Sequence, residues 1–349
     1  MVRYIAVDSG KFATKVAEYD AKTKKVRKFS IRTKADAGDF RDDAIETHTV
    51  VVEIEGQTYK IGNGARGTGA ALETDKKTDI HRLCTLTGIA TLASKDEEDE
   101  IYVAVGLPAK EWANVSKRMD YKDYILPSGK CKISIKKDSA SPVVEKVFTI
   151  KERYVFPESI GALFMDETIN SITPTTITGV LDIGNLNLNA TLWQGTELLQ
   201  DKSLTAELGG AILIQELSQE LTTNIATCDD LITANILKSA DRQIPTNGNL
   251  TDEQIAASKE LIARVLQNHA EKIKRCCHAR NWSLDVTNIV AIGGTSADLK
   301  DELTKAFGSI TVLEDSTYCN VLGYLRMMCA RIKEIGDIIP LPERQDNKK

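Results

Sequence analysis

The sequence lacks any long apolar segment. A membrane-spanning helix needs about 18 or more consecutive apolar residues, and no such window occurs among the 349 residues. The first ten residues, MVRYIAVDSG, include Asp8 and therefore do not resemble a secretory signal peptide. We expect a cytoplasmic protein that makes no contact with a membrane.

The sequence also lacks the patterns that mark metal sites and disulfide frameworks. Its seven cysteines are odd in number, no CxxC occurs, and Cys276 lies next to Cys277. Adjacent cysteines suit neither a zinc site nor an easy disulfide, so reduced thiols are expected. The histidines show no ligand spacing and are expected to be structural: His48, His81, His269 and His278.

A third missing feature is an excess of basic residues. The chain has 45 Lys and Arg against 50 Asp and Glu, for a net charge of −5, whereas nucleic-acid-binding domains usually carry a basic stripe. Direct binding to nucleic acid is therefore not expected. The 42% hydrophobic and 27% charged residues are typical of a globular protein, and the length suits two domains.

The first motif that suggests chemistry is DSGKFATK, residues 8–15. It follows a predicted buried strand over residues 2–8 and precedes predicted strands over 14–20 and 25–31. A β-hairpin turn made of ordinary turn residues would explain this motif if it stood alone. The pattern restarts, however, at the predicted strand 177–185, ITGVLDIGN, which again ends in Asp-x-Gly and precedes two further strands.

This repeat places an aspartate and a glycine at the same point in each half of the chain: Asp8 with Gly10, and Asp182 with Gly184. Tight turns expose backbone N–H groups that can bind phosphate oxygens. Mg²⁺ needs only one or two carboxylates when phosphates and water complete its shell, and Lys15 would add a positive charge. We therefore expect two similar domains that share a nucleotide cleft. A chance repetition of a common turn is the alternative.

Other segments carry start and stop signals. Apolar spacing predicts a helix over 79–93 with Asp79 as its N-cap, and a proline in the first turn suggests a helix over 156–169. A long scaffold helix is predicted over 251–281, capped by Thr251. The remaining predictions are strands at 49–56, 57–63, 100–108, 129–137 and 143–151, and helices at about 108–120, 207–221 and 228–240.

Several of these motifs resemble the actin superfamily of ATPases. DSGKFATK is similar to its first phosphate loop, DIGNLNLNA to its second, and IVAIGGTSADL to its adenosine motif. VFPESIGAL resembles the connecting helix, and YCNVLGYL resembles the Asn-x-x-Gly stretch of the last helix. The resemblance covers nearly the whole chain in the right order. Pro-Glu-Ser-Ile is most similar to the ParM/StbA bacterial actins of plasmid partition.

The resemblance implies an α/β, actin-like fold of the duplicated ribonuclease H type, with two similar domains flanking a nucleotide cleft. Domain I would cover residues 1–175 and would include a small subdomain at about 33–79. Domain II would cover residues 176–340. Residues 341–349 would form a polar tail.

The resemblance also implies a site for ATP or GTP with Mg²⁺. In the ParM/StbA group a glutamate positions the water that attacks the γ-phosphate, and Glu158 is the matching residue. The alternative is a first-turn glutamate that complements a helix dipole. Asp8 and Asp182 would complete the catalytic set and hold Mg²⁺ through water. The residues implied to bind the nucleotide are Ser9, Gly10, Lys11, Lys15, Gly184, Asn185, Gly209, Gly210, Lys238, Gly293, Gly294 and Thr295.

The loops depart from the family pattern at three positions. Lys11 stands where a small hydroxyl residue is usual, and Leu186 and Asn187 stand where Gly or Thr is common. Fewer hydroxyl groups would then contact the phosphates, which affects nucleotide preference and hydrolysis rate. For Lys238, a position on a solvated face is the alternative to a place beside the base.

The function implied is that of a filament-forming NTPase. Subunits would assemble head to tail with one another, and hydrolysis would destabilise the polymer. The filament would move plasmid DNA through an adaptor protein bound to a centromere-like site. The alternative is a small-molecule kinase of the same superfamily, such as a sugar kinase. A kinase would need an aspartate base facing a substrate alcohol and larger insertions, and neither is evident.

Overall fold

The computed structural model describes residues 1–40, 45–67, 69–70, 73, 75–245, 249–285 and 287–334. The chain divides into two units. The first contains Met1–Asn170 and the segment that starts at Asn320, and the second contains Ser171–Cys319. The polar tail predicted at 341–349 lies outside the described residues. No helix in the described part of the chain is both long and apolar enough to cross a membrane.

The first unit is built on one sheet with nine strands among its described residues, in the order β3-β2-β1-β7-β9-β8-β5-β6-β4. The apolar run of β1 is buried, and the strand pairs on both sides, antiparallel with β2 and parallel with β7. The bounds are β1 (Val2–Ser9), β2 (Ala13–Asp20), β3 (Lys25–Arg32), β4 (Ala35–Ala37), β5 (Thr49–Ile54), β6 (Gln57–Gly62), β7 (Asp99–Leu107), β8 (Gly129–Lys136) and β9 (Val144–Pro157).

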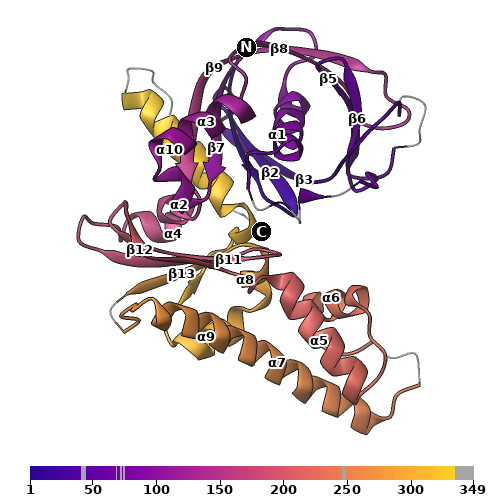
Figure 1. Ribbon diagram of the computed structural model, residues 1–349, viewed down its shortest axis with the longest axis vertical. Coiled ribbons are helices and arrows are strands. Elements are labelled where there is room, and N and C mark those ends of the chain that lie inside the picture. The colour runs from indigo at the N-terminus through magenta and orange to yellow at the C-terminus, as the bar shows by residue number, and fades with distance from the viewer. Residues whose placement is uncertain are drawn as a thin grey trace. The chain divides into compact units, whose positions relative to one another are not determined.

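Helix α1 (Asp79–Leu92) lies inside the curl of this sheet (Figure 1). Its buried residues include Leu83, Leu86 and Ile89, which belong to the core of the unit. The predicted N-cap was wrong by one residue, because Thr78 has the extended cap conformation and Asp79 is the first helical residue. The Asp79 carboxylate instead accepts a hydrogen bond from the hydroxyl of Tyr124.

The hairpin predicted at 49–56 and 57–63 is confirmed as β5 and β6. Glu55 and Gly56 have φ values of 54° and 80°, which suits the tight turn that matches the twist of paired strands. Strand β5 also pairs with β8, with Val52 opposite Ile135. The strands of the predicted small subdomain therefore continue the sheet of the first unit.

The helix predicted over 156–169 is wrong. Strand β9 runs to Pro157, which lies opposite Leu107 in the parallel ladder with β7. Proline lacks an N–H, but the hydrogen bond to the Leu107 carbonyl comes from the Glu158 N–H, so the ladder outweighs the first-turn signal. The chain then forms a 3₁₀ helix, η2 (Ile160–Phe164), and a short helix, α4 (Asp166–Ile169). The helix expected at about 108–120 is also split, into α2 (Ala109–Trp112) and α3 (Val115–Ile125).

The sheet of the second unit repeats the strand order of the first. Its order is β12-β11-β10-β13-β14, which corresponds to β3-β2-β1-β7-β9. In both sheets the first strand of a meander pairs in parallel with the next strand inward. The repeat predicted from the sequence is therefore a repeat of the strand order and pairing in the two sheets. The bounds are β10 (Ile177–Ile183), β11 (Leu188–Gln194), β12 (Glu197–Ala206), β13 (Asn288–Ile292) and β14 (Thr311–Val312).

Helices pack on this second sheet around a core that includes Leu181, Leu213 and Leu266 (Figure 1). The longest described helix begins with a capping box, in which Thr251 and Gln254 each accept a hydrogen bond from the other's backbone N–H. The predicted cap is therefore confirmed. The helices are α5 (Gly210–Asn224), α6 (Asp230–Lys238), α7 (Asp252–Ala279), α8 (Gly294–Asp298) and α9 (Lys300–Phe307), with a 3₁₀ turn η3 (Ser316–Tyr318).

The last described helix, α10 (Cys319–Glu334), belongs to the first unit from Asn320 onward. The prediction that 176–340 forms one domain is therefore wrong at its end. Gly323 packs against the backbone of Gly161 so closely that a Cβ would collide with it. The Tyr324 ring stacks on Phe156 with centroids 6.0 Å apart. These contacts place α10 in the core of the first unit.

Candidate functional site

The first predicted loop follows β1 and is a tight turn. The Gly10 N–H donates to the Asp8 carbonyl at 3.0 Å and to the Ala13 carbonyl at 3.2 Å. A Cβ at position 10 would lie 2.9 Å from the Ala13 oxygen, so the turn requires glycine. The Lys15 ammonium lies 3.4 Å from Asp8 Oδ2. The structure thus brings the predicted aspartate, glycine and lysine of this loop together.

A chain of buried hydroxyl groups lies beneath the same loop. Ser9 Oγ is 3.1 Å from Thr14 Oγ1, and Thr14 Oγ1 is 3.1 Å from Thr33 Oγ1. The Thr33 hydroxyl then donates to the Gly10 carbonyl at 2.6 Å. Buried hydroxyl groups need such partners. The hydroxyls of this region therefore brace the loop from below.

The Asp8 carboxylate is 4% exposed and contacts two ammonium groups. Besides Lys15, it contacts Lys76, whose Nζ lies 3.4 Å from Asp8 Oδ1. Lys76 is 6% exposed and also forms an ion pair with Glu158 Oε1. Sequence reasoning missed Lys76, because it lies in the glycine-rich segment 64–78 and belongs to no recognised motif.

The charged side chains of this cluster favour one another's ionised forms. Burial alone would raise the pKa of the Asp8 carboxyl, but Lys15 and Lys76 outweigh burial and hold that pKa below its usual value. Burial would lower the pKa of Lys76, yet Glu158 and Asp8 raise it. Asp8 and Lys76 are therefore both charged at neutral pH. Nearby, burial and then the Lys76 charge lower the pKa of His81 to about 3, so this ring is neutral.

Glu158 lies just after the end of β9. Its N–H donates to the Leu107 carbonyl at 2.8 Å. The next residue, Ser159, has a φ of 72° and donates its N–H to Asn320 Oδ1 at 3.0 Å. The helix-dipole alternative for Glu158 assumed an α-helix over 156–169, and the structure has a strand end there instead.

The second predicted loop follows β10 and packs on the start of α5. The Gly184 N–H donates to the Asn187 carbonyl at 2.9 Å, and the Gly210 N–H donates to the Gly184 carbonyl at 3.0 Å. A Cβ at Gly209 would lie 2.6 Å from the Asn185 oxygen. The structure therefore brings the two predicted glycine motifs into backbone contact.

The predicted adenosine motif, which contains Gly293, Gly294 and Thr295, packs against the second loop. Gly293 has a φ of 94°, and a Cβ there would lie 2.9 Å from Asp182 Oδ1. Gly294 begins α8, and the Thr295 hydroxyl donates to the Gly184 carbonyl at 2.9 Å. The segments Asp182–Asn185, Gly209–Gly210 and Gly293–Thr295 thus form one backbone-lined group. Lys238, by contrast, is exposed at the end of α6 and makes no ion pair among the described residues.

The donor types present fit Mg²⁺ and phosphate. Within the described ranges, no group of three or more His, Cys, Asp or Glu side chains could hold a metal ion by itself. Each unit instead offers one predicted carboxylate, Asp8 or Asp182, beside a glycine turn. Mg²⁺ commonly takes one or two protein carboxylates together with water and phosphate oxygens. The ionised state of Asp8 suits a cation ligand.

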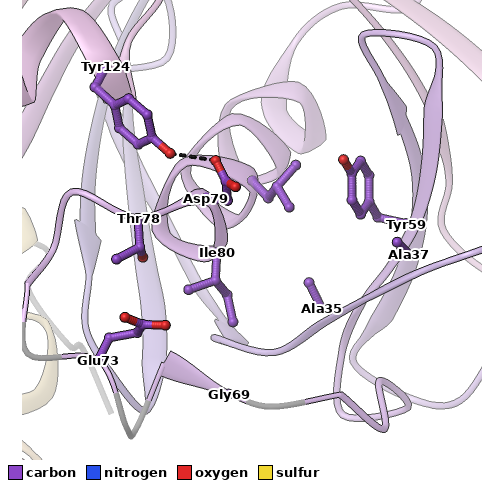
Figure 2. Close-up of a pocket in the computed structure, with 10 residues that line it drawn as sticks. Ala35, Ala37, Tyr59, Gly69, Glu73, Thr78, Asp79, Ile80 and Tyr124 are labelled. Atoms are coloured by element: carbon purple, nitrogen blue, oxygen red, sulfur yellow. Dashed lines mark hydrogen bonds between the residues drawn. The ribbon is translucent and has the colours of Figure 1, made fainter.

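A separate cavity of about 510 Å³ lies at the start of α1 in the first unit (Figure 2). None of the residues that line it is a predicted nucleotide-binding residue. The hydrogen bond between Tyr124 and Asp79 crosses one side of the view. The cavity is lined by Ala35, Ala37, Tyr59, Gly69, Glu73, Thr78, Asp79, Ile80, Leu83 and Tyr124.

Comparisons with known proteins agree with the fold described above. Residues 6–161 match the family model described as "Actin like proteins N terminal domain". No curated protein sequence matches the chain significantly. Among solved structures, the chain is similar to one titled "Alp12 filament structure", with 20% identity and a TM-score of 0.71. That match covers 95% of this chain and 99% of the other.

Two further structures share the fold. The apo form of the pSK41 ParM protein has 15% identity and a TM-score of 0.72, with 96% of this chain and 99% of that chain covered. The archaeal actin homologue Ta0583 in complex with ADP has 13% identity and a TM-score of 0.69, with 93% and 98% covered. We therefore conclude that the chain has the actin-like fold, and that its residues 6–161 match the model of an actin-like N-terminal domain.

Proposed function

We propose that this protein binds ATP or GTP with Mg²⁺, hydrolyses it, and polymerises with copies of itself under the control of that nucleotide. The observation that carries the proposal is the pair of glycine turns with an aspartate, one after the first strand of each of two topologically equivalent sheets. The buried, ionised Asp8 with its lysines supports it further. The ADP complex of the archaeal homologue supports a nucleotide as the ligand.

The proposed roles follow from the chemistry of each group. Asp8 and Asp182 would hold Mg²⁺ through water, and Mg²⁺ would neutralise charge on the phosphates. Glu158 would orient the attacking water, because catalysis of phosphoryl transfer consists mostly of placement. Lys15 would add a positive charge beside the phosphates.

The backbone would bind the rest of the nucleotide. The turns at Gly10 and Gly184 expose backbone donors that would cradle the phosphates. Gly209 and Gly210, at the start of α5, would lie near the ribose or phosphates. Gly293 and Gly294 would allow close approach of the base and ribose. The remaining proposed contacts are Ser9, Lys11, Asn185, Lys238 and Thr295.

The proposed cellular role is the movement or positioning of plasmid DNA in the cytoplasm. The filament would grow by head-to-tail contacts, which do not close into a ring. An adaptor protein on a centromere-like site would connect the filament to DNA, which fits a chain with a net charge of −5. The similarity to an Alp12 filament and to pSK41 ParM supports this role.

The test is 90° light scattering of the purified protein after addition of Mg²⁺ with ATP or GTP, with phosphate release recorded in parallel. We expect a lag, a critical concentration, and a decay as nucleotide is consumed. The variant Glu158→Gln should polymerise and hold its plateau, with phosphate release reduced about 100-fold or more, the lower end of the contribution of a positioned acid or base. Scattering that stays flat while nucleotide binds would overturn the filament proposal and favour a small-molecule kinase.

A further inference from the structure

Ion pairs link four charged residues at the first loop: Asp8, Lys15, Lys76 and Glu158. Of these four, Lys76 belongs to no recognised sequence motif. It lies between β6 and α1, in a segment rich in glycine, and its side chain is almost fully buried. Its ammonium contacts Asp8 from the end of β1 and Glu158 from the end of β9. These two strands flank β7 in the sheet. A single flexible side chain therefore bridges the proposed metal ligand and the proposed water-positioning group.

The charges linked to Lys76 by ion pairs are balanced. Two buried carboxylates, Asp8 and Glu158, face two ammonium groups, Lys15 and Lys76. Buried charges of one sign are costly unless charges of the other sign lie beside them. A divalent cation at Asp8 would add positive charge next to Lys76 and would weaken the attraction between Lys76 and Asp8. A terminal phosphate would bring negative charge that Lys76 can neutralise.

Lysine is suited to such a change of partner. Its ammonium is a point charge on a four-carbon stem with three donors, so it can leave one acceptor for another without a fixed fork geometry. The contact with Asp8 is long, at 3.4 Å, whereas the ion pair with Glu158 is close. Lys76 can therefore keep Glu158 in place while its weaker contact is exchanged.

We propose that Lys76 is a positioning residue that senses the terminal phosphate of the nucleotide. In this account Lys76 holds Glu158 beside Asp8 and directs its remaining donors to the γ-phosphate when Mg²⁺ occupies Asp8. The site would thereby favour a nucleoside triphosphate over a diphosphate. This inference rests on the proposed nucleotide site.

The test is equilibrium binding of a non-hydrolysable triphosphate analogue and of the diphosphate, both with Mg²⁺. The protein concentration is kept below the critical concentration for polymerisation. For Lys76→Met we expect triphosphate affinity to fall about tenfold or more, the scale of one charge-assisted hydrogen bond, and diphosphate affinity to change less than about twofold. Lys76→Arg keeps the cation and should recover part of the loss. Lys77→Met is the matched control, because Lys77 pairs with the exposed Asp120.

The ratio of the two affinities separates sensing from a merely structural role. Equal weakening of both nucleotides by Lys76→Met, or weakening of neither, would overturn the inference. If Lys76→Met does not fold, the double variant Lys76→Met/Glu158→Gln, which removes one charge of each sign, decides by the same ratio. A wild-type protein that binds neither nucleotide would instead overturn the proposed function, and the inference with it.

Discussion

The two predicted phosphate loops have the same place in two equivalent sheets, yet they are held in different ways. Charged side chains hold the first loop, where Lys15 and Lys76 contact Asp8. Backbone contacts hold the second loop, where the Gly210 N–H donates to the Gly184 carbonyl and the Gly184 N–H donates to the Asn187 carbonyl. The two loops therefore have equivalent positions in the topology but are stabilised by different kinds of contact.

This difference predicts which substitutions should destabilise each loop. The first loop should respond to neutralisation and to pH, in addition to an added Cβ at Gly10. A loop fixed by close backbone approach should respond to any added Cβ, whatever its charge, because backbone atoms cannot move aside as a flexible side chain can.

The largest expected effect is at Gly293, where the strand end after β13 packs on the second loop, with Gly293→Ala. At this residue φ is 94° and a Cβ would collide with the Ile183 carbonyl, so strain and clash together should cost about 4 kcal/mol in the free energy of unfolding. Gly308→Ala is the control, because its φ is 78° but nothing lies within 4 Å of the added Cβ. That control should cost about 1 kcal/mol, as measured by urea unfolding. Equal costs for both variants would contradict the close-packing account.

The next effect is in the first loop, with Asp8→Asn. Loss of one partner in a buried ion cluster should cost about 3 kcal/mol at neutral pH. Because the pKa of Asp8 is lowered in the folded state, its contribution is present above its unfolded pKa of about 4 and is lost as pH falls below that value. Urea unfolding at several pH values should therefore show the difference between wild type and variant shrinking below about pH 4.

The control for that pH series is Asp138→Asn. The pKa of Asp138 is also lowered, by hydrogen bonds from Ser141, but this turn residue is fully exposed. We expect little change in unfolding at any pH. A difference for Asp8→Asn that stays constant down to pH 2 would show that the lysines do not act on its charge.

A smaller effect is expected for Thr14→Val, which keeps the shape and removes the central hydroxyl of the chain beneath the first loop. The hydrogen-bond partners left behind should make the variant less stable by about 1–2 kcal/mol in thermal or urea unfolding. Thr304→Val at an exposed position of α9 removes only a hydrogen bond to the preceding turn and should change stability by less than about 0.5 kcal/mol. Equal stabilities of Thr14→Val and Thr304→Val would show that the hydroxyl chain does not stabilise the first loop.

Much of the fold could be predicted because its signals are local. The strands before each Asp-x-Gly turn, the hairpin at Gly56 and the cap at Thr251 all depend on residues within a few positions of one another. The order of the motifs likewise indicated the actin-like fold, which the structure and the comparisons confirm.

The errors arose where distant segments decide the outcome. Pro157 ends a strand because Leu107 pairs with it across the sheet. Helix α10 joins the first unit because Gly323 packs on Gly161, far away in sequence. Lys76 has no local signal, since its partners come from the ends of two strands that only the folded sheet brings together.

The central claim is that the two loops bind one nucleotide. Isothermal titration with Mg²⁺ and the preferred nucleotide should give one nucleotide per wild-type chain. It should also give at least about tenfold weaker binding for both Gly10→Ala and Gly209→Ala, whose added Cβ atoms would press on backbone. Gly308→Ala should bind as wild type. Wild-type affinity in either loop variant would contradict the claim, because that loop would then take no part in binding.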